Sequence, residues 1–97
     1  MSLAQIRYFV AVAEEGTVNG AAARLRIAQP AVSRQIRALE DELGAALFHR
    51  TPAGMRLSTE GRVFLEHGLE ILARLDGAAR AVRSAAATGR PPRSTDR

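Results

Sequence analysis

Cysteine, tryptophan and lysine are all missing from this 97-residue chain, and aromatic residues make up only 4% of it. The absence of cysteine excludes disulfide bonds and thiolate metal sites. The scarcity of aromatic rings predicts a core of Leu, Ile, Val and Ala, and it leaves few side chains on which RNA bases could stack. The chain has no apolar run of about 18 residues and no signal-peptide pattern, so we expect a soluble cytoplasmic protein without membrane contact.

The residue patterns of enzymes and metal sites are missing as well. Ser33 has no nearby histidine in a catalytic motif, and three of the acidic residues are consecutive at residues 40–42. His49 and His67 lack the spacing of metal ligands, and each is more readily explained as a structural or solvent-facing residue. We therefore expect neither enzymatic activity nor a bound metal or cofactor.

Positive charge is concentrated in one part of the sequence. The formal net charge is +4, and every one of the 14 basic residues is an arginine. A GC-rich genome would also explain that bias, but it would not explain the distribution. Residues 17–38 contain no acid, and they hold Arg24, Arg26, Arg34 and Arg37. A local basic surface of this kind is typical of a phosphate-binding face.

Two helices are predicted in the first quarter of the chain. Apolar residues recur at helical spacing over residues 3–15, with Ser2 as the N-cap and Gly16 as the residue that ends the helix. Thr17 is the expected cap of a short helix over residues 18–25. The two residues that follow leave room only for a sharp turn, as in a helix-turn-helix.

A third helix is predicted to begin near Pro30, whose missing N–H needs no partner at a helix start, and to end at Gly44. Its expected buried face consists of Val32, Ile36, Leu39 and Leu43. The opposite face carries Pro30, Ser33, Arg34 and Arg37.

The charge order of this third helix is unfavourable for its dipole. Arginines lie in the first half, and Glu40, Asp41 and Glu42 lie at the end, which costs at most about 1 kcal/mol per exposed acid. If the first half entered the major groove of DNA, one base contact of roughly 1–3 kcal/mol would offset this cost. The acids would then lie away from the phosphates. A solvated helix with no role for its charges is the alternative.

The remaining segments complete the pattern of a winged helix-turn-helix. Residues 47–50 read as a strand, 51–54 as a turn and 55–57 as the return strand. Ser58 is expected to cap a helix that reaches residue 87. About thirty residues make a helix some 40 Å long, which is too long for this small domain to cover. Its apolar seam repeats with four-three spacing at Phe64, Gly68, Ile71, Leu75, Ala78, Val82 and Ala85, which predicts a partner helix.

The fold class expected is therefore mainly α. A winged helix-turn-helix domain would span residues 1–57, a linker and dimerisation helix residues 58–87, and a flexible tail or hinge residues 88–97.

Two motifs resemble a known family. The segments AAARLRIAQPAVSRQIRALEDELGAALFHRT (residues 21–51) and RLSTEGRVFLEH (residues 56–67) are similar to the DNA-binding region of LysR-type transcriptional regulators. The resemblance implies a homodimer with antiparallel linker helices that binds an interrupted inverted repeat in duplex DNA. It also implies that the first helix packs against the partner's linker helix, which would cover Tyr8 and Val12. The implied dimer interface comprises Tyr8, Val12, Phe64, Gly68, Ile71, Leu75, Ala78 and Val82.

The same resemblance implies the DNA-binding residues: Gln29, Pro30, Ser33, Arg34, Arg37, Arg50, Thr51 and Arg56. Gln29 and Arg34 are expected to read bases. Ser33, Arg37 and Thr51 are expected to position the phosphate backbone, which sets register without specifying sequence.

The sequence departs from the family pattern in several places. Ala28 replaces a capping serine, Gly20 replaces a larger residue, and Ala53 replaces a wing-tip arginine. The large effector-binding domain of the family is also missing, so we expect no small-molecule effector site in this chain. We interpret the chain as an excised fragment, and a naturally short regulator is the alternative. The alternative function is a helix-turn-helix module that pairs with proteins and does not bind specific DNA.

Overall fold

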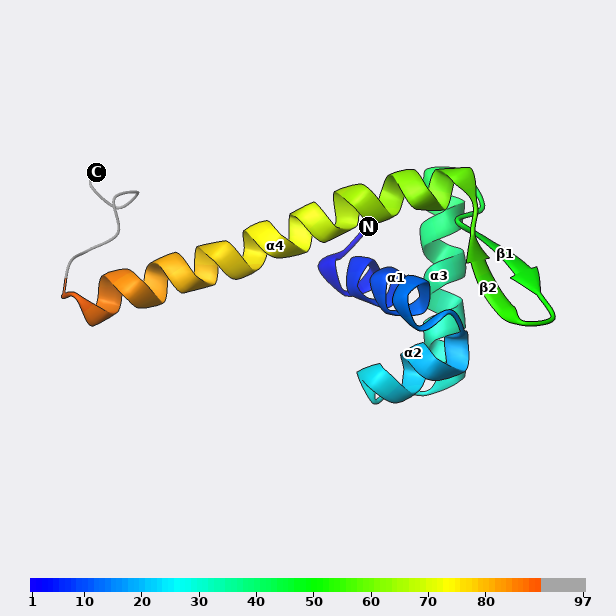
Figure 1. Cartoon of the computed structure of the whole chain (residues 1–97), viewed down its shortest axis with the longest axis horizontal. Helices are drawn as coiled ribbons and strands as arrows, with labels where there is room; N and C mark the ends of the chain where they lie inside the picture. Colours follow the sequence, from blue (N-terminus) through cyan, green and yellow to red (C-terminus); the bar gives the residue numbers. More distant parts are fainter. Residues whose placement is uncertain (90–97) are drawn as a thin grey trace.

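The computed structural model describes residues 1–89, which form four helices and one β-hairpin (Figure 1). In chain order the elements are α1 (Leu3–Glu15), α2 (Val18–Leu25), α3 (Gln29–Leu43), β1 (Phe48–Thr51), β2 (Gly54–Leu57) and α4 (Thr59–Ala87). The predicted fold class, a winged helix-turn-helix followed by a long helix, is confirmed. Most of the predicted tail, residues 90–97, lies outside the described residues.

Three of the four helices start at the residues whose side chains were expected to cap them. The Ser2 hydroxyl accepts a hydrogen bond from the Gln5 backbone N–H (3.1 Å), and the Gln5 side chain accepts one from the Ser2 N–H (3.2 Å). Thr17 caps α2 and Ser58 caps α4 in the same way, each accepting a 2.9 Å hydrogen bond from a backbone N–H three residues later. Local sequence therefore determines where these helices begin.

The core lies between α1 and the elements that surround it. Phe9 of α1 is fully buried, and its ring contacts those of Phe48 in β1 (centroids 5.2 Å apart) and Phe64 in α4 (5.0 Å). These contacts attach both the wing and the long helix to α1. The expected buried face of α3 is correct for three of its four residues. Leu43 is 38% exposed, because it lies in the last turn of α3, beyond the elements that cover the rest of that face.

The wing is a two-stranded antiparallel sheet in which Phe48 pairs with Leu57 and Thr51 with Gly54. The predicted four-residue turn is therefore wrong in its extent: Thr51 and Gly54 belong to the strands. The Thr51 hydroxyl donates a hydrogen bond to the Gly54 carbonyl (3.1 Å), which tightens this end of the hairpin. The Met55 N–H donates to the Gly16 carbonyl (2.8 Å), so the return strand is fastened to the turn between α1 and α2.

The long helix α4 packs on the domain only near its start. Figure 1 shows its second half extending well beyond the other elements. Gly68 is buried, and a side chain there would meet Ile6 and Val10 of α1. Farther along the same helix, Ile71, Leu75 and Val82 are exposed. Over the described residues, no helix combines the length and apolar character that crossing a membrane requires.

Two residues of the predicted dimer interface are buried within the single chain. Val12 is fully buried in the core of its own chain. Gly68 is covered by α1 of the same chain. Within the single chain both positions are therefore already covered, and their place in the dimer interface stays a prediction. Tyr8 is half-buried and packs against the core, as does Phe64.

Candidate nucleic-acid interface

The N-terminal half of α3 presents a polar face to solvent. Gln29, Pro30, Arg34 and Arg37 are exposed, and Ser33 is half-buried. On the opposite face of the same helix Val32, Ile36 and Leu39 are buried, which fixes the rotation of α3 about its axis. The residues predicted to contact DNA on this helix therefore point away from the core as a set.

The start of α3 differs from the starts of the other helices. Ala28 occupies the cap position and provides no side-chain hydrogen bond, and Pro30 lies in the first turn. Unpaired N–H groups at a helix start favour an anion such as a phosphate.

Replacing Ala28 by serine should supply the missing cap. We expect Ala28→Ser to stabilise the protein by about 1 kcal/mol and to raise the midpoint of thermal unfolding by about 4–8 °C. Ala23→Ser, at an exposed position inside α2, is the matched control and should lower stability slightly, because serine is the poorer helix former. Equal melting temperatures for the two variants would contradict a capping role.

Strand alternation gives the wing two different faces. Cross-strand partners share a face, so Arg50 and Met55 lie on one side, and His49 and Arg56 on the other. The first side faces α3. There, a cavity of about 160 Å³ is lined by residues from α2, α3 and the wing: Val18, Ser33, Ile36, Arg37, Glu40, Phe48, Arg50 and Met55. The fold therefore brings the predicted residues Ser33, Arg37 and Arg50 together.

A second cavity, of about 350 Å³, adjoins the tip of the wing and the start of α3. It is lined by Thr17, Val18, Asn19, Gln29, Arg50, Thr51, Pro52, Ala53, Gly54 and Met55. Gln29, Arg50 and Thr51 are thus neighbours, as the predicted DNA-binding set requires. Thr17 and Asn19, which were not among the predicted DNA-binding residues, line the same cavity. Their signal was their position at the start of α2, directly before the arginines of the acid-free segment.

Glu40 plays a different part from the two acids that follow it. Its carboxylate accepts a 2.7 Å hydrogen bond from the Leu47 backbone N–H, and its side chain lines the cavity that holds Arg37 and Arg50. The expectation that all three acids lie away from the binding face is therefore wrong for Glu40. This half-buried residue connects α3 to the segment that leads into the wing.

Arg24 contributes less free positive charge than its acid-free neighbourhood suggested. Its guanidinium forms ion pairs with Glu14 (2.8 Å) and Glu15 (3.3 Å) at the end of α1. The hydrogen bonds that Arg24 donates to the carboxylates of Glu14 and Glu15 raise the pKa of Arg24 above its ordinary value. The segment without acids in the sequence therefore has acidic side chains of α1 beside it in the folded structure.

Apart from Thr51, the other predicted DNA-binding residues lie away from Arg56. Arg56 lines a third cavity, of about 310 Å³, on the side of the wing that faces away from α3. Arg34 lines none of the three cavities and is exposed on α3. Among residues 1–89, no three histidine or acidic side chains lie close enough together to hold a metal ion.

The sequence is similar to proteins of known type. Residues 3–62 match the family described as bacterial regulatory helix-turn-helix protein, lysR family. The chain is 51% identical over 72 residues to the transcriptional regulator ClcR of Pseudomonas putida, which covers 74% of this chain and 24% of ClcR. It is 45% identical over 86 residues to TfdT of Cupriavidus pinatubonensis, covering 89% and 38% of the two chains. The chain thus spans well under half the length of these relatives.

Solved structures of DNA complexes are similar along nearly the whole chain. The DNA-binding domain of CbnR in complex with DNA superimposes with a TM-score of 0.82 at 41% identity, covering 89% of this chain and 99% of that one. The DNA-binding domain of BenM in complex with benA site 1 DNA gives 0.83 at 39% identity, covering 87% and 98%. The chain belongs to the LysR family of bacterial helix-turn-helix regulators.

Proposed function

We propose that this chain is the DNA-binding part of a LysR-type transcriptional regulator and binds specific sequences of duplex DNA as a homodimer. The observation that carries the proposal is the exposed basic half of α3, which shares two cavities with the wing. The similarity to DNA-bound domains at about 40% identity supports it. It also favours DNA binding over a module that pairs only with proteins.

The first half of α3 would enter the major groove. Arg34 suits a bidentate contact to guanine, and Gln29 suits one to adenine. Ser33, Arg37 and Thr51 would contact phosphates, and Arg50 would anchor the wing beside them. Because Arg50 and Gln29 line the same cavity, the wing and α3 would hold one stretch of DNA together.

The second half of α4, which extends beyond the rest of the domain (Figure 1), supports a dimer. Ile71, Leu75 and Val82 are 39%, 37% and 55% exposed on a helix that extends beyond the domain, which leaves an apolar seam for a second copy. Ala78, also exposed, continues this seam. Tyr8 and Phe64, half-buried in the single chain, would lie at the end of the seam where it meets the domain.

The charges of α4 favour an antiparallel pair. Residues 60–70 carry three acids and one arginine: Glu60, Glu66, Glu70 and Arg62. Residues 74–83 carry three arginines and one acid: Arg74, Arg80, Arg83 and Asp76. An antiparallel arrangement places the acidic half of each helix opposite the basic half of its partner, whereas a parallel one opposes like charges. The two recognition helices of such a dimer would enter successive major grooves about 34–36 Å apart.

In-vitro selection from random duplex DNA with purified residues 1–97 tests this function. We expect an enriched inverted repeat with a fixed gap. A single enriched half-site would retain DNA binding and contradict the dimer. If nothing were enriched and no salt-sensitive binding occurred, the chain would instead be a protein-interaction module, because DNA binding releases counterions and weakens steeply with salt.

Two arginines of α3 should have separable effects. Arg34→Ala should remove about 1–3 kcal/mol of discrimination at one position per half-site. Arg37→Ala should weaken binding to all sequences alike and reduce the slope of log K against log salt by about 1. Competition binding with single-base variants of the selected site measures both. If Arg37→Ala relaxed specificity and Arg34→Ala did not, the two roles would be exchanged.

A further inference from the structure

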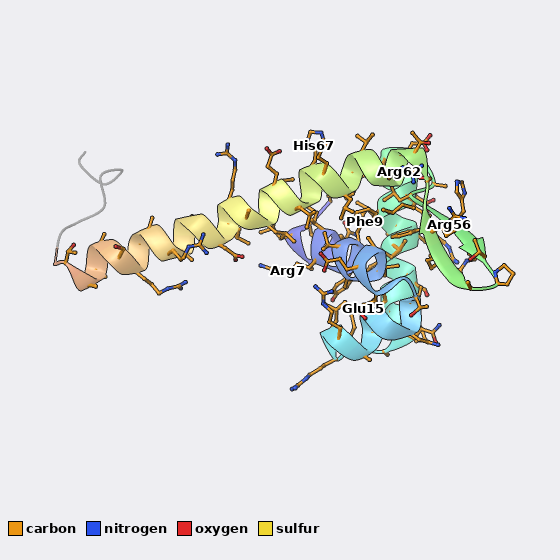
Figure 2. All side chains as sticks on the ribbon, in the orientation of Figure 1. Arg7, Phe9, Glu15, Arg56, Arg62 and His67 are labelled. Carbon is orange, nitrogen blue, oxygen red and sulfur yellow. The ribbon has the colours of Figure 1, made fainter. Side chains whose placement is uncertain are left out.

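The side of the wing that faces away from α3 carries its own group of basic residues. His49 and Arg56 are directly opposite each other on β1 and β2, and their side chains share this outer face. Arg62, in the first turns of α4, lines the same cavity, which is completed by Thr51, Leu57, Ser58 and Thr59. Figure 2 shows Arg56 on the wing and Arg62 on α4 at the same end of the molecule.

This outer cavity has no acid in its lining. Its three ionisable residues, His49, Arg56 and Arg62, are all basic and all exposed. Arg56 and Arg62 therefore have no acidic side chain beside them in this lining. By contrast, Arg24 on α2 has its charge satisfied by two glutamates. A cluster of unsatisfied positive charge is the feature expected where an anion binds.

The chemistry of the lining suits a phosphate. An arginine guanidinium forms two parallel hydrogen bonds to phosphate oxygens, and two arginines from different elements can hold one group from two sides. The side-chain hydroxyl group of Thr59 is a further donor on the same cavity. A phosphate of duplex DNA and free inorganic phosphate share this chemistry.

The position of the outer cavity favours DNA. Thr51 lines both this cavity and the one that contains Gln29 and Arg50, so the two adjoin across the edge of the wing. DNA held by α3 and the inner side of the wing would continue past this edge, with its backbone towards Arg56 and Arg62. We propose that the outer cavity, formed by His49, Arg56 and Arg62, binds one backbone phosphate of the duplex outside the base pairs that α3 reads.

This inference rests on the proposed DNA binding and deepens it. It divides the predicted contacts into an inner set, which includes the base-reading residues, and an outer set that acts on the flanking backbone. The outer set would add affinity and salt dependence without adding sequence information. His49 and Arg62 thereby become DNA-contacting residues, and Arg56 contacts the backbone at a place separate from Arg50.

The first test compares two double variants of equal net charge. Arg56→Gln/Arg62→Gln removes the outer set, and Arg7→Gln/Arg24→Gln is the control away from the outer cavity. We expect the first variant to lose about 0.9 from the slope of log K against log salt per protomer, equivalent to one phosphate. Between about 50 and about 200 mM salt, wild-type affinity should then fall about threefold more per protomer than that of the variant. Selected and scrambled duplexes should be affected equally.

The second test follows the imidazole resonances of His49 by NMR, with His67 as the internal reference. His67 lies on the outer side of α4, farther along the helix than Arg62 (Figure 2). We expect duplex DNA to shift the His49 resonances selectively in the wild type but not in Arg56→Gln/Arg62→Gln. A shift produced by millimolar inorganic phosphate and not by DNA would make this a small-anion site and overturn the assignment.

Failure of DNA binding and failure of the outer phosphate contact would give different results. If the wild-type protein bound no duplex, the proposed function itself would be wrong. If the wild type bound duplex DNA and Arg56→Gln/Arg62→Gln had the same salt slope as the control variant, only the outer phosphate contact would be refuted.

Discussion

Gly61→Ala is expected to destabilise the domain by about 3 kcal/mol or more, because the added methyl group would clash with neighbouring atoms. Gly61 is buried in the first turn of α4. A carbon atom added to it would lie directly against the carbonyl oxygen of Leu47 and 2.9 Å from a methyl carbon of Leu57. The Leu47 carbonyl is itself held by the Ser58 N–H at 3.0 Å, so backbone would have to move. Thermal unfolding followed by circular dichroism would measure the loss.

The opposite result is expected at another glycine of the same helix. At Gly77 the nearest atom to an added methyl is the Arg80 guanidinium, at 3.9 Å. Gly77→Ala should therefore stabilise α4 by roughly 0.5–1 kcal/mol, the usual gain for this change inside a helix. A Gly61→Ala protein that melted at or above the wild-type temperature would show that the close approach of α4 to Leu47 does not exist in solution.

Leu75→Glu should convert the dimer to a monomer. Leu75 lies in the middle of the exposed seam of α4 and is 37% exposed in the single chain. In an antiparallel pair a glutamate there would be buried without a partner in an apolar contact. Loss of the dimer removes the second recognition helix, so affinity for the full inverted repeat should fall by about a hundredfold or more. Sedimentation velocity would give the oligomeric state, and titration with the selected repeat the affinity.

The helix offers a matched control for this change. Leu69 is 43% exposed on α4 and lies on a different side of the helix from the seam. Leu69→Glu introduces the same charge on the same element, and it should leave both the dimer and the affinity for the repeat close to those of the wild type. A dimeric Leu75→Glu protein would refute the proposed interface, since the charge would then not be buried.

The binding face was predicted from sequence only in part. The exposed half of α3 follows from helical periodicity, because Val32, Ile36 and Leu39 define a buried face and thereby the opposite one. The separation of Arg50 from Arg56 does not follow from the composition of the wing. It depends on strand register: Arg50 pairs with Met55 and His49 with Arg56, and successive residues of a strand lie on opposite faces.

The sequence by itself determined where the helices of this protein begin and end. Ser2, Thr17 and Ser58 cap helices through atoms three residues away, and Gly16 and Gly44 end helices through backbone angles of their own, at φ 78° and 71°. These interactions lie within a few residues of the chain, so they can be read without knowing the fold.

Only the tertiary structure decided which surfaces remain open. Val12 is covered by segments that follow it in the chain, Gly68 by a helix some sixty residues earlier, and Glu40 is turned to the Leu47 N–H by the path of the chain into the wing. His49, Arg56 and Arg62 form one group because a hairpin and a helix start meet at one edge of the domain. Burial and charge clustering depend on contacts between distant segments, and the local pattern of residues does not contain those contacts.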